Sequence, residues 1–256
     1  MTYINKLPVI LLISLLSACA GQTPKEQKKE KTDKQGAVIN VQLAAGYIQR
    51  GEWEVAKNKL EKAIKLDKEY VPAYTTMAVL MSMINKPLEA ENYYLEALDL
   101  APKNPELQNN YGTFLCKNGK YKEAFEQFEK VINNAFYDTP EVAHANYGYC
   151  LLQSSKPDYK KTEEHLRFAL KANPKLVSAL LAMAELGIDT RQYLMARAYT
   201  QRYHALVKAN AHSLWVQIQA EYALGDKEYF LQLSKKLIKR FPQSEEVALL
   251  MKLPAL

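Results

Sequence analysis

The side chains with the clearest chemical potential in this chain of 256 residues are three cysteines and four histidines. A cysteine can be acylated, oxidised to a disulfide or used as a nucleophile or metal ligand, and a histidine can act as acid, base or metal ligand. The histidines are His144, His165, His204 and His212. They form no HExxH motif, and no histidine–cysteine spacing is that of a metal site.

Signatures of other catalytic chemistry are missing from the sequence as well. It contains no GxGxxG loop, P-loop or GxSxG motif. Many acidic residues stand one helical turn from a lysine, as in Lys57–Glu61 and Lys122–Glu126, which is typical of solvated helix faces. The net charge of +6 is spread along the chain without a dense basic stripe. We therefore predict a protein that is not an enzyme, with no cofactor, metal, small-molecule substrate or nucleic-acid partner.

Cys19 directly follows a secretion signal. The apolar run Leu7–Leu16, preceded by Lys6, has the length of a signal-peptide core, because a membrane-spanning helix needs roughly 20 residues. The sequence Leu-Ser-Ala-Cys that ends at Cys19 is similar to a bacterial lipobox, whose cysteine is diacylated and then becomes the first residue. We predict a lipoprotein signal peptide at 1–18 and a lipid anchor on Cys19. The alternative is an ordinary signal peptide with a chance cysteine.

The residue after Cys19 indicates the membrane in which the anchor resides. An aspartate at this place resembles an inner-membrane retention signal, and the chain has Ala20 instead. We therefore expect the protein at the periplasmic face of the outer membrane, anchored by lipid rather than spanning the bilayer.

A polar segment follows the anchor. Gly21–Lys34 contains no aliphatic or aromatic residue, so burial cannot offset the entropy of ordering it. We predict a flexible tether over 19–36. Its lysines attract anionic lipid headgroups, but Glu26, Glu30 and Asp33 dilute that attraction, which favours a solvated spacer.

The rest of the chain repeats with a period of about 34 residues. Only 9 glycines occur while 48% of residues are apolar, a composition that favours helices over a turn-dense β-sandwich. Two small positions recur along the chain, at Ala44, Ala78, Gly112, Gly148 and Ala184 and at Ala56, Ala90, Ala124, Thr162 and Ala196. Turn residues recur at Gly51, Asn85, Gly119 and Gly225, and closing prolines at Pro102, Pro174 and Pro242. This pattern is that of tetratricopeptide repeats, and the alternative is an alanine-rich helical bundle.

We predict an all-α superhelical solenoid of six helix-turn-helix tetratricopeptide repeats with a C-terminal capping helix. Two small insertions are expected near Asp138–Pro140 and Lys156–Asp158. The predicted units, which together cover 37–242, are 37–70, 71–104, 105–138, 141–176, 177–210 and 211–242, followed by the cap at 243–256.

The first helix of each repeat is expected to line a concave groove, chiefly at repeat positions 2, 5, 9 and 12. Much of the groove is apolar in this sequence, and exposed apolar surface usually marks a partner site. Lysine and arginine are absent from these positions, so an apolar helix or strand segment is the expected ligand. In the alternative, the tether or the C-terminal helix folds over the groove. The candidate residues are Val38, Val41, Ala45, Ile48, Thr75, Val79, Asn109, Thr113, Tyr149, Leu152, Leu181, Ile188, Trp215 and Tyr222.

Cys116 and Cys150 fall in the first helices of adjoining units. Neighbouring helix axes lie about 8–10 Å apart, and a disulfide needs Cα atoms within roughly 7 Å. A bridge is feasible where the helices tilt together in an oxidising compartment. A disulfide and two free buried thiols both remain open at this point.

Several of these features together resemble one family. The lipobox, the short tether, the six repeats and the stretches Gly46–Gly51 and Leu107–Cys116 are similar to the PilF/PilW family of type IV pilus biogenesis lipoproteins. The resemblance implies a pilotin, which binds the secretin subunit of the pilus and promotes its outer-membrane localisation and multimerisation. It also favours the disulfide between Cys116 and Cys150.

A second function fits the same repeats. Repeat arrays serve many partners, so the chain could be a scaffold lipoprotein for other envelope machinery, such as peptidoglycan enzymes or outer-membrane protein assembly. No motif identifies which groove residues contact a partner.

Overall fold

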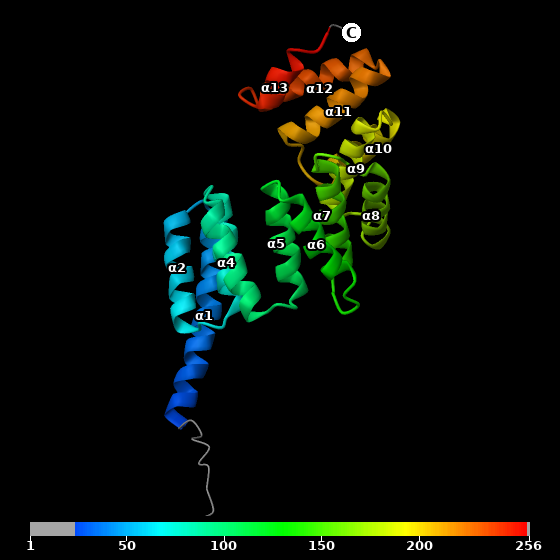
Figure 1. The fold of residues 1–256 in the computed structure, drawn as a ribbon. Helices are drawn as coiled ribbons and strands as arrows, with labels where there is room; N and C mark the ends of the chain where they lie inside the picture. Colours follow the sequence, from blue (N-terminus) through cyan, green and yellow to red (C-terminus); the bar gives the residue numbers. More distant parts are fainter. Residues whose placement is uncertain (1–23, 255–256) are drawn as a thin grey trace, which may run out of the picture.

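The computed structural model describes residues 24–254, which form thirteen α-helices and no strand (Figure 1). Successive helices pair into units that stack into a solenoid, with α13 at the end, which confirms the predicted all-α tetratricopeptide architecture. No helix of this part of the chain has a long enough apolar stretch to cross a membrane. The helices are α1 (Pro24–Gln49), α2 (Trp53–Leu66), α3 (Val71–Met83), α4 (Pro87–Leu100), α5 (Pro105–Lys117), α6 (Tyr121–Ile132), α7 (Pro140–Gln153), α8 (Tyr159–Ala172), α9 (Val177–Asp189), α10 (Tyr193–Leu206), α11 (Ala211–Leu224), α12 (Lys227–Arg240) and α13 (Glu245–Leu250).

The two helices of a unit cross so closely that only small residues fit between them. A Cβ added to Gly112 would lie 3.0 Å from the Phe128 ring, and one added to Gly148 would lie 2.9 Å from Leu166 Cγ. Fully buried alanines occupy the equivalent crossings in the first, second and fifth units, for example Ala44 in α1, whereas the sixth unit has Ile218 there. The recurring small residues of the sequence are therefore the points of closest helix contact.

A left-handed residue ends the first helix in most units. Gly51, Gly119 and Gly225 have φ values of 75°, 74° and 75°, and Asn85 has 60°. The fifth unit uses Arg191 at φ 59°, although side chains larger than asparagine rarely adopt this region. The repeat geometry demands the turn there, and the sequence gives no sign of it.

Helix α1 begins far earlier than the sequence predicts. Residues 24–36, assigned to a flexible tether, are helical, so that part of the prediction is wrong. Lysine, glutamate and glutamine are good helix formers, and extending the packed helix from Ala37 avoids the cost of nucleation. An i,i+4 ion pair between Glu30 and Lys34, at 2.8 Å, adds to this. Cys19, the signal peptide 1–18 and the tether residues 19–23 lie outside the described residues.

The interfaces between neighbouring units, which we call seams, differ in how closely their helices pack. The first helices of units pack against one another in the pairs α1/α3, α5/α7, α7/α9 and α9/α11. The seam between the second and third units is looser, because α5 meets the preceding unit mainly through α4. Three aromatic rings fill this seam. The centroid of the Tyr94 ring lies 5.4 Å from that of Tyr111 and 5.2 Å from that of Phe114. An ion pair between Lys120 and Glu91, at 2.6 Å, spans the same seam.

The C-terminal end of the array is covered by α13. Leu250 of this helix is buried and joins a core cluster with Leu214, Leu233 and Leu237 of α11 and α12. Short though it is, α13 removes the apolar surface of the last unit from water, as terminal units of solenoids must.

A glycine-to-alanine exchange at a close crossing tests this packing. The Cβ of Gly187→Ala would lie 2.8 Å from the backbone nitrogen of Ala196, so α9 and α10 must separate. We expect the free energy of unfolding to fall by about 1–3 kcal/mol, measured by urea denaturation. The matched control is Gly46→Ala, whose nearest atom is Arg50 Nη1 at 3.8 Å. It should gain up to about 1 kcal/mol from helix propensity. Equal stabilisation by both changes would contradict a close crossing.

Candidate functional site

The concave side of the array carries a pocket formed by the first helices of the last three units. The α7–α9–α11 pocket has a volume of about 240 Å³ and is lined by Ala145, Asn146, Tyr149, Ser178, Leu181, Ala182, Glu185 and His212. Ala145, Leu181 and Ala182 make part of its lining apolar, and the ring of Tyr149 is 44% exposed. Two predicted groove residues, Tyr149 and Leu181, thus meet in one cavity.

The polar wall of this pocket is a contact between His212 of α11 and Glu185 of α9. His212 Nε2 lies 2.8 Å from Glu185 Oε1, and Gln153 Nε2 donates to Glu185 Oε2 at 3.4 Å. The hydrogen bond to Glu185 raises the pKa of His212 despite the opposing effect of burial. Burial, together with the Glu185 charge, raises the pKa of Tyr149 and of Asp189. The pocket therefore combines apolar lining with one carboxylate whose position is fixed by two neighbours.

Two further recesses lie in the loose seam between α3 and α5. One of about 280 Å³ is lined by Val79, Met83, Thr113 and Phe114 among others, and one of about 220 Å³ includes Thr75. Asn110 lines both recesses. Thr75, Val79 and Thr113 thus lie where the sequence predicts a groove.

Two predicted groove residues are not available to a partner. Asn109 and Leu152 are only 5% and 4% exposed, so their assignment to the open surface is wrong. Asn109 Oδ1 accepts a hydrogen bond from Asn146 Nδ2 at 3.1 Å, across the tight α5/α7 seam. Leu152 packs into the core cluster of the fourth and fifth units.

The remaining predicted groove residues line none of these three cavities. Val41 and Ile48 pack partly against the first core cluster, Trp215 against the last one, and the Tyr222 ring contacts Phe230 at 5.7 Å. Val38, Ala45 and Ile188 are at least partly accessible elsewhere on α1 and α9.

Two polar residues of these cavities do not stand at the repeat positions expected to line the groove. Asn110 and Asn146 are each the sixth residue of their predicted units, and the expected positions are 2, 5, 9 and 12. Glu185 and His212 do occupy expected groove positions, the ninth and the second residues of their units. The repeat register therefore points to both residues, but the candidates were chosen mainly from the apolar residues at these positions.

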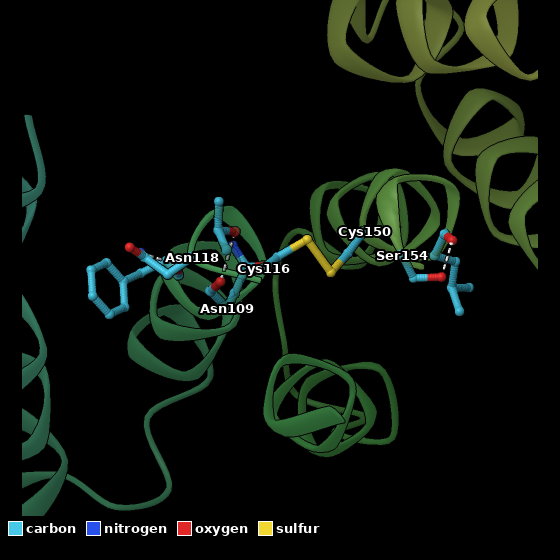
Figure 2. Close-up of a disulfide and its surroundings, with 8 residues drawn as sticks. Asn109, Cys116, Asn118, Cys150 and Ser154 are labelled. Carbon is cyan, nitrogen blue, oxygen red and sulfur yellow. Dashed lines mark hydrogen bonds between the residues drawn. A yellow bond between two sulfur atoms is a disulfide. The ribbon is translucent and has the colours of Figure 1, made fainter. Parts of the chain in front are cut away.

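A disulfide joins Cys116 of α5 to Cys150 of α7, with the Cα atoms 5.8 Å apart (Figure 2). Both cysteines are buried, and the bond lies near the C-terminal ends of their helices. Of the two alternatives left open by the spacing, the structure has the bridge. It fixes the seam beside the α7–α9–α11 pocket. Within residues 24–254, no group of three or more histidine, cysteine, aspartate or glutamate side chains is arranged to hold a metal ion.

Removing this bridge should loosen the α5/α7 seam. The double variant Cys116→Ser and Cys150→Ser opens a loop of 34 residues in the chain, which corresponds to about 2–4 kcal/mol of lost stability. We expect a lower Tm and faster hydrogen exchange of α5 and α7, with exchange of α11 and α12 unchanged. Unchanged exchange at the seam would mean that packing alone holds it.

Comparisons with known proteins agree with this architecture. The tetratricopeptide repeat family profile matches residues 93–126. The chain is 31% identical over 241 residues to the type IV pilus assembly protein PilF of Pseudomonas aeruginosa, covering 93% of this chain and 94% of that protein.

Two solved structures are similar over most of the fold. PilW, described as a widely conserved type IV pilus biogenesis factor, superimposes with a TM-score of 0.75 at 26% identity, covering 84% of this chain and 98% of PilW. Pseudomonas aeruginosa PilF gives a TM-score of 0.72 at 28% identity, covering 86% and 98%. Identity, coverage and fold agree, and the chain belongs to the PilF/PilW family of tetratricopeptide-repeat proteins of type IV pilus biogenesis.

Proposed function

We propose that this type IV pilus biogenesis protein is a pilotin: a lipoprotein of the outer membrane that binds the secretin subunit through its concave groove and promotes secretin localisation and multimerisation. It acts by binding, not by catalysis. The observation that carries the proposal is the α7–α9–α11 pocket, an open and partly apolar recess on a surface built for protein contacts.

The size of this pocket favours a protein ligand over a small molecule. Its volume of about 240 Å³ is below the roughly 300–1,000 Å³ of most small-molecule sites. One or two apolar side chains of a bound segment fill such a space. The Asn146 amide offers both a donor and an acceptor to a peptide group beside them.

The preformed contact between Glu185 and His212 makes the pocket selective. Glu185 is held by His212 and Gln153, so its carboxylate keeps its place whether or not a partner is bound. A partner segment that presents an acidic group there would meet like charge, whereas one with a backbone N–H or a cationic side chain would be accepted.

Anchoring and binding are separate parts of the proposal. The lipobox that ends at Cys19 supports attachment to the outer membrane, and the groove supports recognition. The lipid anchor would hold the groove at the membrane where a secretin ring is assembled.

A substitution in the pocket tests recognition. Tyr149→Arg fills the recess with a charged side chain while replacing a residue that is 44% exposed. We expect secretin binding to weaken by about 5- to 150-fold, the usual effect of losing an aromatic anchor, with fewer denaturant-resistant secretin multimers. Tyr159→Arg, which is 39% exposed on α8 and outside the pocket, is the matched control. Equal behaviour of the two variants would exclude this pocket as the secretin site.

Replacing Cys19 tests the anchor. Cys19→Ala should incorporate no labelled palmitate, and secretin should assemble poorly or in the wrong membrane, measured by fractionation and by multimer yield. Purified Cys19→Ala protein should still bind secretin, because the groove is unchanged. Normal secretin rings in a strain that lacks the gene would contradict the pilotin function and favour a scaffold for other envelope machinery.

A further inference from the structure

One face of α1 is covered by no other described part of the chain. It consists of side chains spaced three or four residues apart, which places them in one stripe along the helix. All of them are exposed, and we call the stripe the α1 outer face. Its members are Lys25, Lys28, Lys31, Gln35, Ile39 and Leu43.

The helix sorts the charges that are mixed along the sequence. Glu30 and Asp33 point to the other side, where they line a recess together with Leu66, the last residue of α2, and the loop residues 67–69. Glu30 also pairs with Lys34 at 2.8 Å. The α1 outer face itself carries lysines and no acidic residue. The described acidic side chains Glu30 and Asp33 therefore do not dilute the positive charge of this face.

Apolar side chains continue the same stripe toward the array. Ile39 and Leu43 are 47% and 44% exposed, whereas Ala37 and Ala44 on the opposite side of α1 are fully buried. The N-terminal part of α1 extends beyond the stacked helices, as the blue end of the ribbon in Figure 1 shows. The stripe thus passes from basic to apolar along one helix.

We propose that the α1 outer face lies on a surface of anionic phospholipid, with the lysines among the headgroup phosphates and Ile39 and Leu43 at the edge of the acyl region. This rests on the proposed acylation of Cys19. Clustered lysines beside apolar side chains are the chemistry that binds such a surface.

Chain length supports this occupant over others. Five peptide units separate Cys19 from Pro24, where α1 begins, so the helix starts at most about 17 Å from the acylated residue. An anchored chain therefore holds Lys25 and Lys28 at a high effective concentration of headgroups. Contact with the bilayer would make α1 a rigid support that fixes the orientation of the groove, in place of a flexible tether.

Chemical anchoring reproduces this geometry without bacterial acylation. Cys116 and Cys150 are joined to each other, so Cys19 of chain 19–256 is the thiol left for coupling to a maleimide lipid. The core clusters of the described structure contain only residues from Ala37 onward, so this chain keeps its fold. Hydrogen exchange of α1 is then compared on phosphatidylcholine vesicles with and without phosphatidylglycerol.

We expect exchange over 24–43 to slow at least about tenfold on the anionic vesicles, because each lysine favours the anionic surface by about fivefold. The variant Lys25→Gln, Lys28→Gln, Lys31→Gln should lose this slowing, and so should Ile39→Ser, Leu43→Ser in part. The control Lys235→Gln, Lys236→Gln, Lys239→Gln removes the same charge from exposed positions of α12 and should keep it.

Three outcomes would overturn the proposal. The first is that hydrogen exchange of α1 is equal on vesicles with and without phosphatidylglycerol. The second is that the α1 and α12 lysine variants lose the slowing of exchange to the same extent. The third is that the slowing depends on the density of protein on the vesicle rather than on the charge of the lipid. The last would assign the α1 outer face to a second copy of the chain. None of these outcomes bears on the pilotin function, which is read from palmitate labelling and secretin multimers.

Discussion

In five of the six units the two helices cross where only glycine or alanine fits, and the rest of the structure depends on this constraint. Gly112, Gly148 and Gly187 each face a neighbouring helix where an added Cβ would collide. A close crossing brings the backbones together and lets bulky residues such as Phe128 and Leu166 fill the adjacent space. Because the crossing recurs in successive units, the first helices follow one another along the concave side and pack directly in the pairs α1/α3, α5/α7, α7/α9 and α9/α11. The pocket that we assign to a partner is a by-product of this stacking.

The units are not equally bound to one another. The α5/α7 seam has a disulfide and the Asn109–Asn146 hydrogen bond, and the α10/α11 seam has an ion pair between Arg197 and the fully buried Glu221. A buried carboxylate without its partner would be costly, so this ion pair fixes how the last unit docks. The seam between the second and third units relies on three aromatic rings and a partly exposed ion pair, both contributed on one side by α4. The chain thus concentrates its strongest cross-links around the α7–α9–α11 pocket.

The repeat period made much of this fold predictable from the sequence. Ala44 and Gly148 identify the crossings, Gly51 and Asn85 the turns, and the insertion near 156–158 falls in the loop before α8. Prediction failed where local pattern does not decide the outcome. The first turns of α1 are helical without being buried, so the polar composition of residues 24–36 led to the wrong prediction of a flexible tether. The left-handed turn at Arg191 is imposed by neighbouring helices, not by its residue type.

Site residues were harder to predict than the fold, for the same reason. Repeat position places a side chain on a face, but the separation of neighbouring helices decides whether it is open or buried. Where the disulfide draws α5 and α7 together, Asn109 is closed off; where α9 and α11 leave a recess, Glu185 and His212 become its wall. The distances between neighbouring helices depend on the three-dimensional packing, and the repeat period of the sequence does not determine them.

Because the seams differ in strength, the two ends of the array should resist tension unequally. A solenoid under tension yields where neighbouring units share least surface, because each unit is held only by those beside it. Force applied between the N-terminus and the groove must cross the loose seam between the second and third units, so the first two units separate from the rest there. The covalent link between α5 and α7 then stops the unravelling, and the pocket keeps its shape behind it. The array is compliant toward its N-terminal end and stiff around the α7–α9–α11 pocket.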